Sequence, residues 1–283
     1  MSTERTLCVA NCQFAVGPDV RANGRSMRRL LARARSGGAE LVHFPECALS
    51  GYAGVDFHSL DGYDWAALAQ ETAALCDEAR RHGMWVVFGS MHYLDATHPP
   101  TNCLYVLAPD GTLVERYDKR FCTSGEHRYF TPGTHLGLFE AKGVRCGLLI
   151  CYDVRFPELY RAYVRAGVDL VLHSFYNARK TGPDILTVIM RQSAQVMAAT
   201  NHVWVSAANA SGHYQTWAGA VIRPDGSIEV SHRRNRSGCA IATVDLSREY
   251  YDASGPYRAR AMDGVLQSVT PADHPRRADR RTF

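Results

Sequence analysis

The sequence predicts an α/β fold in which two mixed β-sheets pack face to face and helices cover the outside. Three observations support this prediction. Strand-like and helix-like segments alternate along the 283 residues, two hairpins turn on Pro-Asp-Gly, and no Pro-, Ser- or Gly-rich linker divides the chain. We therefore expect one domain, 1–265, followed by a tail, 266–283. Two small α/β domains are the alternative.

The first half of the chain follows the order β-α-β-α-β and then a hairpin. Apolar runs mark the strands, apolar residues at helical spacing mark the helices, and Asp64 is a suitable N-cap for the second helix. The expected elements are strands at 6–14, 40–44 and 84–93, helices at 21–37 and 64–83, and an antiparallel hairpin at 101–119.

The second half repeats this pattern. Pro157 is well placed as the first residue of a helix, because its missing N–H costs nothing there. The expected elements are strands at 143–151, 168–175 and 202–210, a helix from Pro157 to Gly167, a long helix before residue 202, and a second hairpin at 218–233.

Composition narrows the class of function. The net charge is only +4 and the basic residues are scattered, so nucleic-acid binding has little support. The clearest basic cluster, 273–283, has four arginines interrupted by two aspartates, and we interpret it as a solvated or docking tail. The N-terminal stretch lacks the layout of a secretory signal, and no apolar run approaches the ~20 residues of a membrane span. We expect a cytoplasmic protein with no membrane partner.

The cysteines favour reduced thiols. Their number, nine, is odd and no CxxC pair occurs, so neither a disulfide framework nor a zinc site is expected. No GxxxxGK[ST] phosphate loop occurs either, and we expect no metal, nucleotide or other cofactor.

Three reactive residue types follow predicted strands. Glu46 follows "LVHFP", Lys119 follows "LVERYD" and Cys151 follows "GLLI". Reactive groups of α/β proteins gather at such strand ends. Singly, each has a simpler explanation: a helix cap, a surface charge, and one more buried thiol. Lysine occurs at only three positions against 29 arginines, so a compact ammonium at 119 is less readily explained as surface filler.

Together these groups suit nucleophilic catalysis. A thiol has a free pKa of ~8.5 and needs a base, and Glu46 can take its proton. Lys119 and the backbone N–H of Tyr152 can stabilise the negative charge that develops during attack on an amide or nitrile carbon. The protonated glutamate can then donate to the departing amine and later activate water.

These residues lie in motifs that resemble the nitrilase superfamily of thiol-dependent carbon–nitrogen hydrolases, from about residue 7 to 244. The motifs are "FPECALSGY" (44–52), "ERYDKRFCTSGEHRYFTPG" (115–133) and "GLLICYDVRFPE" (147–158). The resemblance implies Cys151 as nucleophile, Glu46 as general base, Lys119 as stabiliser of the intermediate and Glu126 as a supporting glutamate. It also implies an αββα sandwich and a homodimer or higher homo-oligomer.

Two stretches depart from the pattern of the relatives. Residues 197–201 read "MAATN" where many relatives have Arg-Ala-x-Glu-Asn, so Met197 and Thr200 replace a charged pair. His173 stands where proline is common. The first departure affects contacts at the expected dimer face, and the second affects the wall of the expected pocket.

The segment "CYDVRFPE" resembles the amidase and carbamoylase branches, whereas nitrilases usually have Trp-Glu after the nucleophile. We therefore expect hydrolysis of a small linear amide or N-carbamoyl compound with release of ammonia. A nitrilase and a non-catalytic protein that retains the fold are the alternatives. Arg155 could bind a substrate carboxylate or pair with Asp153 or Glu158. Further substrate-binding candidates are Tyr52, His127, Tyr152, Phe175, Tyr176, Asn177 and Trp217.

Overall fold

The computed structural model describes residues 5–179, 181–277 and 279–281. The described chain divides into two compact units, 5–251 and 252–281. The second unit contains helix α5 (Gly255–Met262), none of whose residues is buried. The end of the catalytic domain expected at residue 265 stays a prediction.

The first sheet of residues 5–251 has the strand order β12-β1-β2-β3-β4-β5. Strands β1, β2 and β3 are parallel, and β12, β4 and β5 join them by antiparallel pairing. The bounds are β1 Thr6–Gln13, β2 Leu41–His43, β3 Trp85–His92, β4 Thr101–Leu107, β5 Leu113–Asp118 and β12 Gly238–Asp245. Helices α1 (Val20–Ser36) and α2 (Trp65–His82) pack together, and Asp19 and Asp64 cap their N-termini.

The second sheet repeats this arrangement with the order β11-β10-β9-β8-β7-β6. Its parallel centre is β7, β8 and β9, and the outer strands pair antiparallel. The bounds are β6 Gly137–Ala141, β7 Val144–Ile150, β8 Leu170–Phe175, β9 Trp204–Asn209, β10 Ala220–Ile222 and β11 Ile228–Ser231. Helices α3 (Pro157–Arg165) and α4 (Ile185–Asn201) pack beside each other on this sheet.

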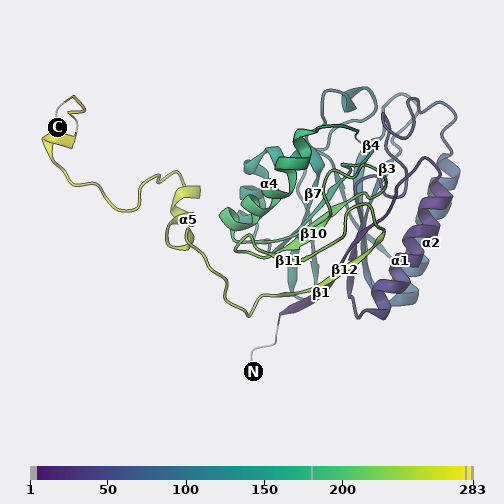
Figure 1. Cartoon of the computed structure of the whole chain (residues 1–283), viewed down its shortest axis with the longest axis horizontal. Coiled ribbons are helices and arrows are strands. Elements are labelled where there is room, and N and C mark those ends of the chain that lie inside the picture. Colours follow the sequence, from purple (N-terminus) through teal and green to yellow (C-terminus); the bar gives the residue numbers. More distant parts are fainter. Residues whose placement is uncertain (1–4, 180, 278, 282–283) are drawn as a thin grey trace. The chain divides into compact units, whose positions relative to one another are not determined.

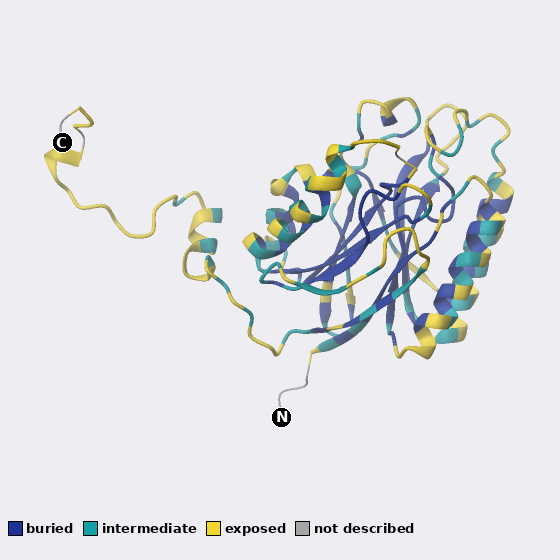
Figure 2. Cartoon of the chain, in the orientation of Figure 1, coloured by how far each residue is buried: buried dark blue, intermediate teal, exposed yellow. Residues whose placement is uncertain are grey.

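The two sheets face each other across a common core. Strand β1 contacts β9, and β4 contacts β7. Figure 1 shows α1 and α2 on one outer side of the sheets and α4 on the other. Figure 2 shows buried strands between helices whose outer surfaces are exposed. The predicted αββα sandwich is confirmed.

Among the described β-strands and α-helices, the sequence does not predict β6, β12 and α5. Strand β6 is short and joins β7 through a tight turn in which Lys142 and Gly143 both have positive φ. Strand β12 pairs with β1, the first strand, so its place depends on a contact between distant parts of the chain.

The basic tail is exposed where the structure describes it. Residues 273–277 and 279–281 of the basic tail are exposed, and residues 278, 282 and 283 lie outside the described part. Within the described residues, every helix is too short or too polar to cross a bilayer.

Candidate active site

The strands bring Glu46 and Lys119 to the same edge of the first sheet. Glu46 lies three residues after β2 and Lys119 directly after β5. Strand β5 runs in the same direction as β2, because two antiparallel pairings separate it from β3. Cys151 directly follows β7 of the facing sheet.

Glu46, Lys119 and Glu126 form a buried ionic cluster. The Lys119 Nζ lies 2.8 Å from Glu46 Oε1 and 2.7 Å from Glu126 Oε1. The side chains of Glu46 and Lys119 are fully buried. These findings exclude a helix cap and a surface charge as explanations. An ammonium has three protons, so two of them bind the glutamates and a third remains for another acceptor.

Asn102, on β4, positions both glutamates. Its Nδ2 donates to Glu46 Oε1 at 2.8 Å and to Glu126 Oε1 at 3.4 Å. The backbone N–H of Thr123 donates to Glu126 Oε2 at 2.7 Å. Glu46 Oε2, in contrast, is buried without a hydrogen-bond partner. An unpaired buried acceptor costs about 1–3 kcal/mol, which suits an atom that must bind a proton during catalysis.

Two glycines let the loops that carry these residues approach neighbouring backbone. A Cβ added to Gly89 would lie 2.3 Å from Cys47 N and 2.4 Å from Pro45 O. A Cβ added to Gly133 would lie 2.2 Å from Asp118 O. Any larger residue would therefore push on the backbone next to Glu46 or next to Lys119.

Cys151 stands at a strained turn that Asp153 holds. Cys151 has φ +42°, a value that side-chain-bearing residues rarely adopt, and it begins a 3₁₀ turn, Cys151–Arg155. The Asp153 carboxylate accepts hydrogen bonds from Ile150 N at 2.9 Å, Tyr117 OH at 2.8 Å and Phe121 N at 3.1 Å. It thereby ties the turn to the end of β5.

Asn177, two residues after β8, contacts the Cys151 thiol. Its Nδ2 lies 3.8 Å from Cys151 Sγ, and its Oδ1 accepts from Trp217 Nε1 at 2.9 Å. Its backbone N–H donates to Asn209 Oδ1 at 2.8 Å. Trp217 therefore fixes the side-chain amide that contacts the sulfur, and Asn209 fixes the backbone of the same residue.

The charges of the cluster act on one another and on the thiol. Burial raises the pKa of Glu46, the Glu126 charge adds to this, and Lys119 opposes it. Burial would also raise the pKa of Glu126, but Lys119 and the hydrogen bonds hold it below the usual value. Burial alone would lower the pKa of Lys119, yet the glutamates raise it well above its ordinary value. Burial and the Glu46 charge raise the pKa of the Cys151 thiol, and Lys119 opposes them.

The other candidates divide between the interior and the surface. Phe175 and Trp217 are buried and their rings meet at 4.9 Å, so both belong to the core. Tyr52 stacks on Phe130 and contacts Tyr176, whose hydroxyl donates to Asp56. His127 is exposed.

Arg155 and Tyr152 lie on the surface beside the nucleophile. Among the contacts of the described residues, Arg155 has no ion pair or hydrogen bond with Asp153 or Glu158, so the structural pairing considered for it is wrong. The Tyr152 ring packs edge-on against Phe156. The Arg155 guanidinium, four residues from Cys151, therefore makes no ion pair with any acidic side chain of the described residues.

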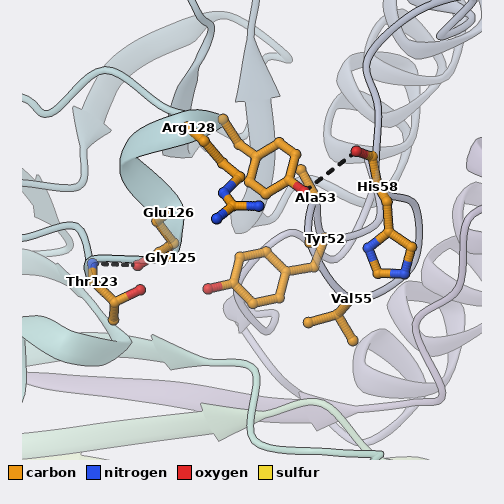
Figure 3. A pocket seen from close by; sticks show the side chains of 10 residues that line it. Tyr52, Ala53, Val55, His58, Thr123, Gly125, Glu126 and Arg128 are labelled. Atoms are coloured by element: carbon orange, nitrogen blue, oxygen red, sulfur yellow. Dashed lines mark hydrogen bonds between the residues drawn. The ribbon is translucent and has the colours of Figure 1, made fainter.

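A cavity of about 330 Å³ borders the ionic cluster on the side of Tyr52 and Glu126. Figure 3 shows Arg128, Tyr52 and His58 around it, and the hydrogen bond from Thr123 to Glu126 at its edge. This volume suits a small molecule. Among the described residues, no group of three or more His, Cys, Asp or Glu is placed to hold a metal ion.

Comparison with known proteins identifies the family. The profile of the family described as "Carbon-nitrogen hydrolase" matches residues 8–251. The chain belongs to the carbon-nitrogen hydrolase family. Its membership of the nitrilase superfamily, expected from the three motifs, is thereby confirmed.

Two amidases of known sequence and one of known structure are similar to this chain. The hydrolase is 30% identical to the omega-amidase NIT2 of Bos taurus over 77% of this chain and 81% of that protein. It is 28% identical to the deaminated glutathione amidase of the same organism, over 84% and 76%. A crystal structure of an amidase from Nesterenkonia sp. superimposes with a TM-score of 0.75 at 22% identity, over 94% of this chain and 98% of that chain.

Asn102 and Asp153 are the functional candidates that sequence reasoning missed. Asn102 lies within the apolar run of β4 and reads as an ordinary strand residue. The sequence suggests Asp153 only as a partner for Arg155. Nothing local to either residue signals that it binds groups from other strands.

The two departures from the family pattern have visible consequences. His173 is buried, its Nδ1 lies 2.8 Å from Tyr160 OH, and its ring stacks on Phe175 at 4.2 Å. Met197 packs against the core, while Thr200 is exposed and its carbonyl accepts from Arg161 of α3.

Proposed function

We propose that this hydrolase cleaves the C–N bond of a small linear amide through a thioester on Cys151. The observation that carries the proposal is the unequal hydrogen bonding of the two carboxylate oxygens of Glu46. Its Oε1 is held by Lys119 and Asn102, whereas its buried Oε2 has no partner, and its charge acts on the Cys151 thiol. A carboxylate in that state is suited to exchange a proton with sulfur.

The first half of the reaction forms the thioester. Glu46 takes the Cys151 proton while Sγ bonds to the amide carbon, and the carbonyl electrons move to oxygen. The third proton of Lys119 and the backbone N–H of Tyr152 stabilise this oxyanion. The intermediate collapses, the C–N bond breaks, and Glu46 returns the proton to nitrogen so that ammonia leaves.

The second half restores the thiol. Glu46 removes a proton from water, whose oxygen attacks the thioester carbon, and the same oxyanion contacts serve again. Collapse breaks the C–S bond and releases the acid, and Glu46 gives its proton back to Cys151. Glu126 and Asn102 act as positioning residues, because they fix Lys119 and Glu46 throughout.

The names of similar proteins support an amide substrate. They include omega-amidase, deaminated glutathione amidase and an amidase in complex with butyramide. Another structure of the Nesterenkonia amidase shows the result of Michael addition of acrylamide at its active-site cysteine. The exposed Arg155, which forms no ion pair within the part of the chain that the structure describes, supports a substrate that carries a carboxylate.

Exposed apolar side chains and free cysteines bear on the assembly and the location of the protein. We propose a homodimer, because α4 exposes Ile185, Val188 and Val196, which is unusual for a free helix face. All nine cysteines are free, which supports a cytoplasmic location. The basic tail is proposed to remain solvated.

The test is ammonia release from matched compounds. Purified chain receives butyramide, succinamic acid, N-carbamoyl-β-alanine and butyronitrile in turn. The proposal expects ammonia and acid from the amides, with succinamic acid preferred over butyramide. Conversion of butyronitrile alone would assign a nitrilase. Loss of the succinamic acid preference in Arg155→Ala, with butyramide unchanged, would assign the carboxylate to Arg155.

A further inference from the structure

Cys12 and Cys239 face each other on β1 and β12, the outermost pair of strands at one edge of the first sheet. They are directly opposite in the antiparallel pairing of β1 and β12, which Figure 1 shows side by side. Their sulfur atoms lie 3.4 Å apart, and both thiols are free. Among the hydrogen bonds of the described residues, this is the one that joins two thiols.

The register places these thiols where a cross-strand disulfide can form. The N–H of Leu246 donates to the carbonyl of Arg5, so that opposing pair is hydrogen-bonded. Hydrogen-bonded and non-hydrogen-bonded pairs alternate, and Cys12 lies an odd number of residues beyond Arg5. Cys12 and Cys239 are therefore a non-hydrogen-bonded pair, with Cα atoms about 4.5 Å apart, within the roughly 4.4–6.8 Å that a disulfide spans.

The two thiols differ in access. Cys12 is fully buried, whereas Cys239 is only partly buried. The Cys239 thiol donates to the carbonyl of Leu30 at 3.5 Å, and Leu30 lines a cavity of about 270 Å³. Arg29 and Arg33 of α1 line the same cavity. Cys239, the partly buried thiol of the pair, is therefore the one that a small oxidant reaches first.

The pKa shifts of the two thiols also make Cys239 the first to react. The hydrogen bond from Cys12 lowers the pKa of Cys239, and the charge of Arg33 lowers it further. Burial raises the pKa of Cys12 well above its usual value. Cys239 is the better source of thiolate, the form that reacts with oxidants.

We propose that Cys12 and Cys239 form an oxidisable dithiol site that hydrogen peroxide converts into a disulfide. The Cys239 thiolate attacks one peroxide oxygen, so an S–O bond forms and the O–O bond breaks, which gives Cys239 sulfenic acid and hydroxide. The Cys12 sulfur then attacks the sulfenic sulfur. The S–S bond forms, the S–O bond breaks, and water leaves. In sum, two thiols and one peroxide give one disulfide and two waters.

The link would join the first and last strands of the compact unit of residues 5–251. It would close a loop that contains nearly the whole unit, and long loops gain most from a disulfide in the chain-entropy account. Oxidation should therefore raise the urea concentration at which the unit unfolds.

The experiment is a peptide map of the full chain after stoichiometric hydrogen peroxide. Remaining thiols are alkylated with N-ethylmaleimide and the digest is analysed without reductant. We expect a linked peptide that contains Cys12 and Cys239, lighter by two hydrogens than the two reduced peptides and separated by dithiothreitol. The oxidised chain should unfold at higher urea than the reduced chain.

Matched variants isolate the pair. Cys239→Ser should abolish the linked peptide and the urea shift, while Cys76→Ser, at another partly buried thiol, should keep both. A map in which Cys12 and Cys239 stay fully alkylated while other cysteines oxidise would overturn the proposal. So would Cys239 sulfinic acid with Cys12 still free. These readouts do not depend on amide turnover, so they stand apart from the proposed function.

Discussion

Two buried polar clusters lie on either side of Phe44 and Pro45 in the core of this hydrolase. On one side, Glu46 belongs to the ionic cluster with Lys119 and Glu126. On the other side, His43 belongs to a neutral network that joins the two sheets. Both are removed from water, yet only one leaves a polar atom without a partner.

In the neutral network, both ring nitrogens of His43 and the two serine hydroxyls beside it have hydrogen-bond partners. Asn11 Nδ2 donates to Ser206 Oγ at 2.9 Å, and Ser206 lies 3.0 Å from His43 Nδ1. His43 Nε2 lies 2.8 Å from Ser174 Oγ, which donates to the carbonyl of Phe44 at 2.8 Å. Since the Ser174 proton is used on Phe44, His43 Nε2 must donate and Nδ1 must accept. Burial lowers the pKa of His43 to about 3, so it stays neutral.

The ionic cluster is built differently. Two carboxylates share one ammonium, and Glu46 Oε2 has no hydrogen-bond partner. A closed buried network thus stabilises a fold, whereas a network with an excess charge and an open acceptor can move protons. Substitutions in the two clusters should therefore affect different properties.

Cys151→Ala should have the largest effect on turnover. Without the thiol there is no atom to acylate, so ammonia release should fall on the order of 10⁵-fold or below detection. The midpoint of urea unfolding should stay near wild type, because the residue is partly exposed and alanine leaves the strain at its positive φ unchanged. Ammonia assays and urea titration measure the two. Retained turnover would remove Cys151 from the mechanism.

Lys119→Met should reduce turnover by about 10²–10³-fold, because one oxyanion donor is lost. It also leaves two buried carboxylates without their cation, so the free energy of unfolding should fall by about 3–5 kcal/mol. The urea midpoint and kcat measure these effects separately.

The double variant Lys119→Met/Glu126→Gln sharpens this result. It removes one negative charge together with the positive one, so stability should partly recover while turnover should not. Recovery of turnover in the double variant would show that Lys119 serves only to balance charge.

Glu126→Gln should move the acid limb of the pH–rate profile. The charge of Glu126 helps to raise the pKa of Glu46, whose basic form is lost as pH falls through that raised value. Without this charge the pKa of Glu46 falls, so the limb of kcat/KM should shift to lower pH, with a loss of about tenfold in kcat.

Asp153 provides the control, since burial raises its pKa to about 6. A limb that stays in place in Glu126→Gln and vanishes in Asp153→Asn belongs to Asp153. That outcome would contradict the assignment of the general base to Glu46.

His43→Gln should have the smallest effect on turnover, less than tenfold, but should lower the free energy of unfolding by about 1–3 kcal/mol. Because the folded pKa of His43 lies below the ordinary 6.5, its contribution is complete above pH 6.5 and is lost as pH falls toward 3. Between these two pH values, titration of His43 contributes up to about 1.4 kcal/mol per pH unit to the dependence of the free energy of unfolding on pH. The His43→Gln variant should lose this contribution. Urea titrations at several pH values measure it. A turnover loss as large as that of Lys119→Met would erase the distinction between the clusters.

Much of the fold could be predicted because its central units are local. The β-α-β units signal themselves by apolar periodicity, by the caps Asp19 and Asp64, and by Pro157. Strand β12 could not be placed, because its partner β1 lies at the other end of the unit. Pairing between distant segments is not encoded in any single window of sequence.

The candidate site shows the same limit. Glu46, Lys119 and Cys151 could be selected because each reactive residue type follows a strand. The sequence could not show that Asn102 binds both glutamates, or that the Arg155 guanidinium has no acidic partner among the described residues. Phe175 and Trp217 suit either a pocket wall or the core; both pack in the core, and their contact with a substrate stays a prediction.

The central claim is that amide cleavage passes through an acyl group on Cys151. Hydroxylamine tests it most directly, because it intercepts a thioester to give a hydroxamate. Butyramide and methyl butyrate share one acyl group, so at fixed hydroxylamine both should give the same ratio of hydroxamate to acid, and Cys151→Ala should give neither. A ratio that changes with the leaving group, or acid without hydroxamate, would contradict a common acyl-enzyme.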